Sequence, residues 1–280
     1  MRKPRELSNV GKISAYAVLS VFTLFAIYPI LRVIAISLRP GDRLLSKSLA
    51  LIPPDASINT YIQLFFDEPF FRWMANSLIV SGAVTLAGVG LAASAGYAFS
   101  RYKFAGRDGA MIGIITTQMF PVTMLLLPLF IMLIKIKAYD NYIGLIIAYS
   151  ATALPFTIWQ MKGYYDTIPY SLEEAARIDG CSEFGIFWRI VLPLAAPALV
   201  ITALFSFMTA WSEYLVAAVL IQDQNLFTLP LGLKTFQSNM EVSWGLYSAG
   251  AVVVSIPVVA LFLLLSRWLV SGLTLGSVKG

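Results

Sequence analysis

The sequence has 280 residues, of which 58% are hydrophobic and 12% are charged, and its formal net charge is +5. About a quarter of the residues of soluble domains are charged, so this composition excludes an ordinary soluble domain. The chain has no histidine, one cysteine (Cys181) and no G-x-x-x-x-G-K-[ST] stretch, which excludes histidine-based triads and metal sites, an intrachain disulfide and a nucleotide-binding P-loop.

Several apolar runs of about 20 residues match the thickness of a bilayer core. They are too long and too rich in Leu, Ala and Gly for barrel strands, so we predict an all-α polytopic membrane protein with six transmembrane helices. The predicted spans are residues 13–38, 76–100, 110–134, 142–164, 194–220 and 246–270.

The N-terminal end predicts an uncleaved first span. Residues 1–12 are basic, as a cytoplasmic tail would be. The apolar run 13–38 is longer than the roughly 7–15 residues of a signal-peptide core and has no A-x-A exit. Residues 39–72 follow as a polar, extracytoplasmic loop.

Two later spans carry residues that predict close packing and bending. Gly88, Ala92 and Gly96 recur every four residues in the second span, a spacing that lets helix backbones approach closely in lipid. A heterodimer contact with another chain and packing within this chain would use the same spacing. Gln118, Pro121 and Pro128 predict that the third span bends around a cavity, because freed backbone groups need protein or water partners.

The basic residues predict the orientation. With the N-terminus inside, inner segments hold twelve Lys and Arg residues and outer segments hold seven, while Arg32 lies within a span. This bias favours two cytoplasmic termini. It also places residues 169–193 and the tail 271–280 in the cytoplasm.

Residues 169–193 are the main polar interruption in the second half of the chain. Ser171 and Glu174 form an S-x-x-E pattern, which predicts a capping box at a helix start. Gly180 stands where that helix must end, at a position that often requires positive φ. Ser182 then predicts the cap of a second short helix with an apolar face of Phe184, Phe187 and Trp188.

A helix this short is marginal by itself in water. Its small apolar face comprises Leu172, Ala175, Ala176 and Ile178. Small side chains suit a narrow protein groove, so we expect a docking element for a cytoplasmic partner. An ordinary loop between spans is the alternative that composition alone leaves open.

The spacing of this stretch resembles a known motif. Glu174-Ala175-Ala176, three residues, Gly180, nine residues and Ile190-x-Leu192-Pro193 match the EAA motif of ABC importer permeases, E-A-A-x3-G-x9-I-x-L-P. Further matches over the whole chain are Asn76-Ser77-Leu78, the stretch from Gly96 to Arg101, Trp211-Ser212-Glu213, and the ending from Gly272 to Gly280. The chain thus resembles the permeases of binding-protein-dependent ABC sugar importers, in particular the maltose/trehalose-type branch.

The resemblance implies a type I importer (MetI-like) fold with a peripheral first helix and a five-helix core over residues 73–270. It implies a homologous, MalF-like second permease as heterodimer partner, two MalK-like ATPase subunits that bind ATP and magnesium, and an extracytoplasmic sugar-binding protein. In such permeases the EAA helix sits in a cleft of the ATPase. The residues that the resemblance assigns to this coupling are Glu174, Ala175, Ala176, Asp179, Gly180 and Pro193.

The resemblance also assigns the C-terminal tail to the ATPase subunits. The residues concerned are Gly272, Thr274, Gly276 and Lys279. Leu275 departs from the pattern, since a small residue is more usual there.

The transport path and the binding-protein contact are predicted less directly. Polar or aromatic groups inside the spans are the candidates for the path, with packing as the alternative role: Gln118, Tyr149, Trp211, Glu213 and Tyr214. In the loop after the fifth span, the candidates for binding-protein contact are Phe236, Gln237 and Asn239.

Together these observations predict a non-enzymatic permease subunit of a sugar importer in the bacterial inner membrane, with no cofactor or metal of its own. The same machinery for another solute, such as glycerol phosphate, is an alternative. An ion-coupled carrier would want paired intramembrane acids and internal symmetry. A channel or a membrane anchor would leave the EAA spacing unexplained.

Overall fold

The computed structural model describes residues 8–40, 52–53, 55–237 and 242–275. In these ranges the regular elements are helices, and the one β-type pairing is an isolated bridge between Gln237 and Val242. The predicted all-α class is confirmed. The chain divides into two compact units, Met1–Pro69 with Leu233–Ser255, and Phe70–Gly232 with Ile256–Gly280.

The first unit contains α1 (Asn9–Ser37), α2 (Asn59–Phe66) and the beginning of α13 (Trp244–Leu275). Most of α1 up to Ile30 is exposed, its last turns are partly or fully buried, and its hydropathy suits a membrane span. At its end, the Ser37 hydroxyl lies 2.7 Å from the hydroxyl of Tyr61. This bond joins α1 to α2.

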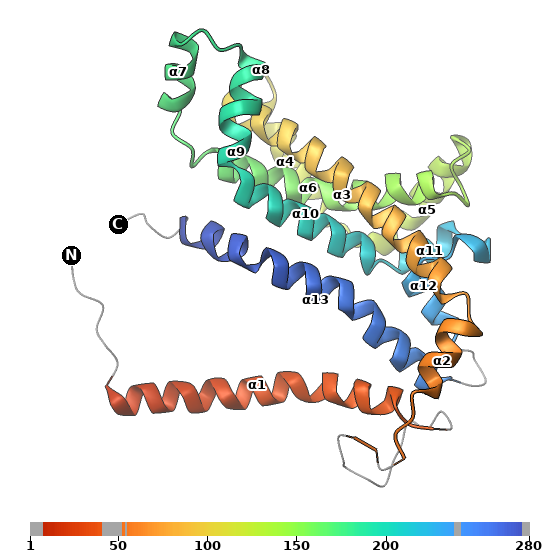
Figure 1. Ribbon diagram of the computed structural model, residues 1–280. Coiled ribbons are helices and arrows are strands. Elements are labelled where there is room, and N and C mark those ends of the chain that lie inside the picture. The colour runs from red at the N-terminus through yellow and green to blue at the C-terminus, as the bar shows by residue number, and fades with distance from the viewer. Residues whose placement is uncertain (1–7, 41–51, 54, 238–241, 276–280) are drawn as a thin grey trace. The chain divides into compact units, whose positions relative to one another are not determined.

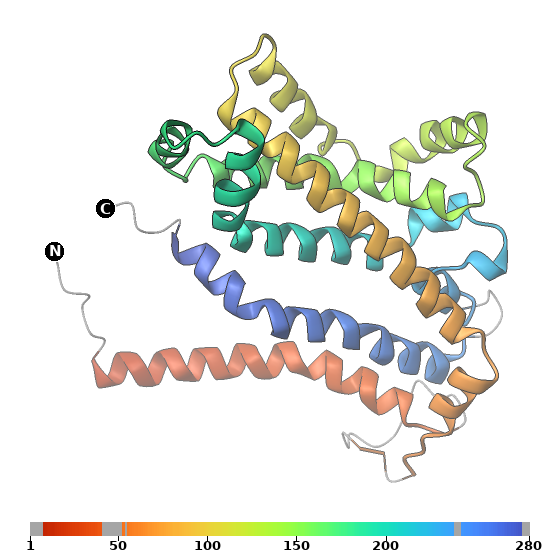
Figure 2. The ribbon, with the colours of Figure 1, turned by 45° about the horizontal axis from the view of Figure 1, so that its top comes forward.

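The second unit is built on three helices that pack against one another: α3 (Phe70–Arg101), α6 (Tyr142–Tyr165) and α10 (Ala196–Trp211). Figures 1 and 2 show α3 crossing both α6 and α10. One apolar cluster lies around Val84 and Tyr149, and another around Tyr97 and Tyr165.

Small residues of α3 make this packing close. A Cβ atom on Gly88 would lie 2.8 Å from the Ser206 hydroxyl oxygen of α10, and one on Gly96 would lie 2.7 Å from the Cβ of Met161 in α6. Ala92 is fully buried between these two glycines. The predicted four-residue line therefore serves packing within the chain.

The third predicted span is not one helix. It comprises α4 (Arg107–Thr117) and α5 (Val122–Lys135), which meet at 103°. Pro121 stands directly before α5 and has no N–H to continue the α4 ladder. The prediction of a bend in this span is confirmed, but the bend is a complete break.

The fifth predicted span is also interrupted. A short helical stretch, α8 (Glu183–Ile186), the π-helix η1 (Phe187–Val191) and α9 (Leu192–Leu194), meets α10 at 77°. A second break separates α10 from α11 (Leu215–Leu220). The single helix predicted over 194–220 is therefore wrong.

At the second break a side chain replaces the missing helical partner. A carboxylate oxygen of Glu213 accepts a 3.0 Å hydrogen bond from the amide of Val216 in the first turn of α11. Beyond α11 the chain continues through η2 (Gln224–Leu226) and α12 (Leu229–Lys234).

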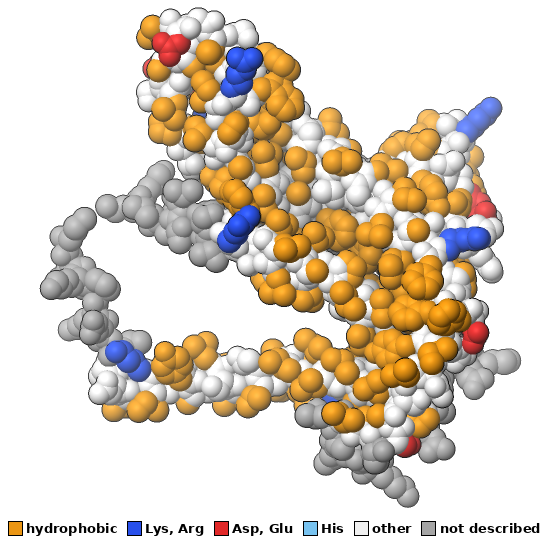
Figure 3. All heavy atoms as spheres, in the orientation of Figure 1, with side chains coloured by type: hydrophobic (Ala, Val, Ile, Leu, Met, Phe, Trp, Pro, Cys, Tyr) orange, Lys and Arg blue, Asp and Glu red, His pale blue; other side chains and the backbone are white. Residues whose placement is uncertain are grey.

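Within the ranges that the structure describes, four helices are long and apolar enough to cross a membrane by themselves: α1, α3, α6 and α13. The pair α4–α5 and the pair formed by Glu183–Leu194 with α10 bring the number to six if each bent pair is one span. Figure 3 shows hydrophobic side chains over much of the visible surface. This surface suits a lipid environment.

The close approach of α3 to α6 predicts different effects of alanine substitution at two glycines of the same helix. Gly96→Ala should lower the free energy of unfolding by about 1–3 kcal/mol, because its methyl group would meet both Met161 and the backbone nitrogen of Lys162. Gly90→Ala has nothing within 4 Å of the new Cβ and should change stability by no more than about 0.5 kcal/mol. Thermal unfolding in detergent micelles measures both, and equal effects would contradict the prediction.

Candidate functional site: the EAA segment

The EAA segment, residues 169–193, begins with α7 (Ser171–Ile178). The carbonyl of Pro169 accepts from the amide of Leu172 at 3.2 Å, and the carbonyl of Tyr170 accepts from that of Glu174 at 3.1 Å. Tyr170 has αR backbone angles and makes no side-chain cap. Its ring lies 5.9 Å from the guanidinium carbon of Arg101 and 5.2 Å from that of Arg177.

The predicted capping box is therefore wrong. Ser171 is the first helical residue and not the cap, since the helical bonds already start at Pro169 and Tyr170. The carboxylate of Glu174 is exposed and makes no hydrogen bond to the described part of the chain. Glu174 is thus left facing outward.

The end of α7 has the conformation predicted for it. Gly180 has φ of +83°. The amide of Cys181 donates to the carbonyl of Ala176 at 2.9 Å, and that of Gly180 donates to the carbonyl of Arg177 at 3.0 Å. These two bonds form a Schellman motif, with glycine at the residue that requires the left-handed region.

The turn after α7 is fixed by a cap and an ion pair. The Ser182 hydroxyl accepts from the amide of Gly185 at 3.2 Å, which confirms the predicted cap of the second short helix. Arg177 donates two hydrogen bonds to Glu183, of 2.6 and 2.9 Å. The Arg177 guanidinium lowers the pKa of the Glu183 carboxyl, and the same contact raises the pKa of Arg177.

The helix α7 has two different faces. Ser171, Glu174, Ala175 and Ile178 share the i, i+3, i+4, i+7 spacing of one helical face, and all four are exposed. We call this set the outer face of α7. On the opposite side Glu173 and Ala176 are buried, so of the predicted EAA residues Ala176 points inward while Glu174 and Ala175 point outward.

The buried side of α7 carries a carboxylate, Glu173, that the sequence did not single out. Its side chain is fully buried, and it accepts hydrogen bonds from the hydroxyl of Tyr97 (2.9 Å) and from Nε of Arg101 (2.5 Å). Both partners belong to the last turns of α3. The available signal was the i, i+4 spacing of Tyr97 and Arg101 at the end of the second span, combined with a second glutamate beside Glu174.

The second half of the EAA segment also divides its aromatic residues. Phe187 packs on Tyr97, with ring centroids 4.9 Å apart. Phe184 and Trp188 are exposed. Pro193 lies in α9 directly after the π-helix, and Asp179 is the exposed C-cap of α7.

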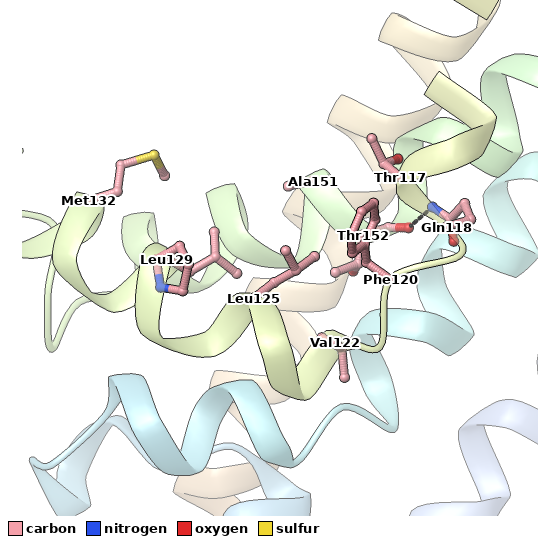
Figure 4. A pocket seen from close by; sticks show the side chains of 10 residues that line it. Thr117, Gln118, Phe120, Val122, Leu125, Leu129, Met132, Ala151 and Thr152 are labelled. Carbon is pink, nitrogen blue, oxygen red and sulfur yellow. Dashed lines mark hydrogen bonds between the residues drawn. The ribbon is translucent and has the colours of Figure 1, made fainter. Parts of the chain in front are cut away.

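A cavity of about 290 Å³ lies where α4, α5 and α6 meet. Its polar lining consists of Thr117, Gln118 and Thr152, and Leu125, Leu129 and Met132 line the α5 side (Figure 4). The Gln118 amide nitrogen donates to the carbonyl of Thr152 at 2.9 Å. Of the predicted path residues, Gln118 thus lies at a cavity.

The other predicted path residues lie in or beside the packed interior. Tyr149 is fully buried, and its hydroxyl lies 3.4 Å from the carbonyl oxygen of Glu213. Trp211 is buried and stacks on Phe207 at 5.3 Å. Tyr214 is partly buried against the Val84 cluster, and Glu213 caps α11. Their part in a transport path stays a prediction.

A network of polar bonds holds the segment after α11 in place. The Asn76 side-chain nitrogen donates to the carbonyls of Asn225 (2.8 Å) and Phe227 (2.9 Å), and the Tyr142 hydroxyl donates to the Asn76 oxygen at 2.7 Å. We call this set the Asn76 clamp. Figures 1 and 2 place α7 and α11 toward opposite ends of the second unit.

Several predicted contact residues are placed only in part. Gly272 and Thr274 belong to α13, while Gly276, Lys279 and Asn239 lie outside the described residues. The Phe236 side chain is buried. The side-chain oxygen of Gln237 accepts from Lys234 at 2.8 Å.

Comparison with known proteins gives consistent matches. The sequence profile of the family described as "Binding-protein-dependent transport system inner membrane component" matches residues 86–274. The maltodextrin transport system permease protein MdxG of Bacillus subtilis is 34% identical over 97% of this chain and 97% of its own length. The maltose/maltodextrin transport system permease protein MalG of Escherichia coli is 34% identical over 95% of each chain. These matches confirm the resemblance to maltose-type permeases.

Among solved structures, the fold matches a chain of a bacterial ABC transporter involved in the import of the acidic polysaccharide alginate. The TM-score is 0.81, with 24% identity over 96% of this chain and all of the other. The likeness confirms the predicted type I importer fold.

Gly180 predicts a test of the backbone at the end of α7. A Cβ there meets nothing within 4 Å. A substitution should therefore destabilise the turn only because of the positive φ, by roughly 1–2 kcal/mol for most residues. Gly180→Val should raise hydrogen exchange at Cys181 and in the last turn of α7 by about tenfold. Gly180→Asn should change it much less, because Asn tolerates the left-handed region. Equal exchange in both variants would refute the assignment.

Proposed function

Because the chain belongs to the family of binding-protein-dependent transport system inner membrane components, we propose that it is the permease subunit of an ATP-driven importer of maltose-type oligosaccharides. The relatives described above belong to maltodextrin and maltose transport systems, which supports this cargo. In this proposal the chain hydrolyses no ATP. Two partner ATPase subunits bind ATP and magnesium, a homologous second permease completes the membrane part, and an extracytoplasmic binding protein delivers the sugar.

The outer face of α7 is the observation that carries the coupling role. Ile178 is 87% exposed, and burying such a side chain contributes about 1.5–3 kcal/mol. Glu174 shares this face and Asp179 follows it, and carboxylates are costly in lipid. A groove of a water-exposed protein, here the ATPase, suits a face that combines exposed apolar and acidic groups.

The charge bias supports an orientation with both termini in the cytoplasm. In that orientation α7 faces the ATPase subunits, and the tail from Gly272 to Lys279 reaches toward them. The opposite end of the second unit, with the Asn76 clamp, then faces the binding protein. The residues Phe236, Gln237 and Asn239 are the proposed contacts in the loop that follows.

The cavity at Gln118 is the proposed place where this chain meets the sugar. Its side-chain amide and the hydroxyls of Thr117 and Thr152 supply both donors and acceptors, which sugar hydroxyls require. The apolar wall of α5 suits the C–H faces of a sugar ring. Tyr149, Trp211, Glu213 and Tyr214 complete the proposed path residues.

Substitution of the outer face tests the coupling role. Ile178→Asp should weaken association with the ATPase subunits by roughly tenfold or more, because it replaces the most exposed apolar side chain of the proposed contact with a charge. Co-purification of the ATPase and sugar uptake by reconstituted vesicles measure this effect.

Ile136→Asp is the matched control. Ile136 is an exposed isoleucine after α5, near the other end of the second unit, and its substitution should leave ATPase association unchanged. Normal association and uptake in the Ile178 variant would overturn the proposed docking site.

The Asn76 clamp generates a second test. Asn76→Ala removes the donor to the carbonyls of Asn225 and Phe227 and the acceptor for Tyr142. We expect the ratio of binding-protein-stimulated to basal ATPase activity to fall about fivefold. Asn9→Ala, at the exposed start of α1, is the control, and an unchanged ratio in both variants would contradict the proposed role of this end.

A further inference from the structure

The second face of α7 carries a buried charge that the docking role does not use. Among the acidic residues that the structure describes, Glu173 alone is fully buried. Glu173 and Glu174 are neighbours in the sequence. In the eight-residue helix α7, however, the side chain of Glu173 is buried and that of Glu174 is exposed. A buried carboxylate is costly unless it is paired and hydrogen-bonded.

The partners of Glu173 come from α3. Arg101 Nε lies 2.5 Å from one carboxylate oxygen, and the Tyr97 hydroxyl donates to the other at 2.9 Å. Nη2 of Arg177, on α7 itself, is 4.0 Å away. The side chain of Arg101 is only 8% exposed, so the pair is shielded from solvent and its charge-assisted bonds are strong.

Arg101 also uses both of its terminal nitrogens as donors. Nη2 donates to the carbonyl of Ile168 at 3.0 Å, and Nη1 donates to the hydroxyl of Ser100 at 3.0 Å. Ile168 belongs to the connection between α6 and α7. One guanidinium therefore binds the end of α3, the connection that leads into α7, and α7 itself.

This arrangement resists sliding. If α7 moved away from α3, the carboxylate of Glu173 and the guanidinium of Arg101 would both lose their partners in a buried place, which is far more costly than parting two apolar surfaces. Tyr97 adds packing, because its ring contacts Tyr165 and Phe187 with centroids 5.8 and 4.9 Å away. The outer face of α7 remains free while the inner face is held.

We propose that Glu173, Arg101 and Tyr97 form an ionic anchor that makes α7 and the inner end of α3 move as one body. This inference rests on the proposed function, since the force on α7 comes from the ATPase. The three are positioning residues: they touch neither the sugar nor the nucleotide. ATP-driven displacement of α7 passes through the anchor to α3, and from α3 to α6 and α10, which pack on it.

The test measures the distance between α7 and α3 directly. Cys181, the only cysteine of the chain, is exposed directly after α7, and Ser94 is exposed on α3. Spin labels on Cys181 and on Ser94→Cys, in the complex with its ATPase subunits in lipid nanodiscs, report this distance. We expect one narrow distribution that is the same without nucleotide and with ATP and vanadate.

Variants of the anchor should change that result. Glu173→Gln should broaden the distribution, and the amount of sugar transported per ATP hydrolysed should fall about tenfold. Tyr97→Phe, which keeps the ring contacts and loses one hydroxyl, should shift both quantities in the same direction by less. Asp108→Asn and Tyr102→Phe, at exposed positions near the same end of α3, should change neither.

Two outcomes would overturn the anchor. One is a wild-type distance that differs between the two nucleotide states. The other is an unaltered distribution in Glu173→Gln. The width of the distance distribution without nucleotide does not depend on ATP hydrolysis, so it tests the anchor independently of the proposed function. The association experiment with Ile178→Asp tests the proposed function.

Discussion

The close approach of α3 to α6 and α10 is the constraint on which the second unit depends. In lipid there is no hydrophobic force between helices, so association relies on packing and polar bonds. Gly88 and Gly96 allow that packing because a Cβ at either position would meet the neighbouring helix. The result is a core of three helices that approach one another closely along α3.

The EAA segment uses this core as its support. One side of α7 is fixed to α3 by a buried ion pair, and the other side is exposed and ends in the isoleucine Ile178. A short helix has little stability of its own. The C-terminal end of α7 is therefore held in place by the Schellman motif at Gly180 and by the hydrogen bonds of Arg177 to Glu183. Local fixation and outward exposure together are what a docking element requires.

The sequence predicted the helical class, the turn at Gly180 and the cap at Ser182 correctly, because each depends on local chemistry or composition. It predicted a bend near Pro121 but not a complete break there, and it did not predict the break after α10, since hydropathy is the same on both sides of a break. The capping box at Ser171 was wrong because Tyr170, the residue before it, already has αR backbone angles and its carbonyl accepts the first helical bonds. The partners of Glu173 lie more than seventy residues away, and no local pattern brings them together.

The sequence therefore identified many residues of the site but not the directions in which their side chains point. The motif named Glu174, Ala175 and Ala176 together, yet Ala176 faces inward and the other two face outward. Tyr149 and Trp211 show the same limit, because their polar edges suggested a path while both are buried in packing. The direction of a side chain follows from the tertiary fold.

The π-helix η1 gives the nine-residue interval of the motif a structural meaning. The amide of Leu192 donates to the carbonyl of Phe187, five residues earlier, so this turn holds one residue more than an α-turn. Pro193, which has no N–H and crowds the turn before it, follows at once. The number of residues between Gly180 and Ile190 therefore suits a helix with one widened turn. Removing a single residue there would rotate Leu192 and Pro193 by roughly 100° about the helix axis. The length of the motif thus sets the helical register, that is, the direction in which Leu192 and Pro193 face relative to α7.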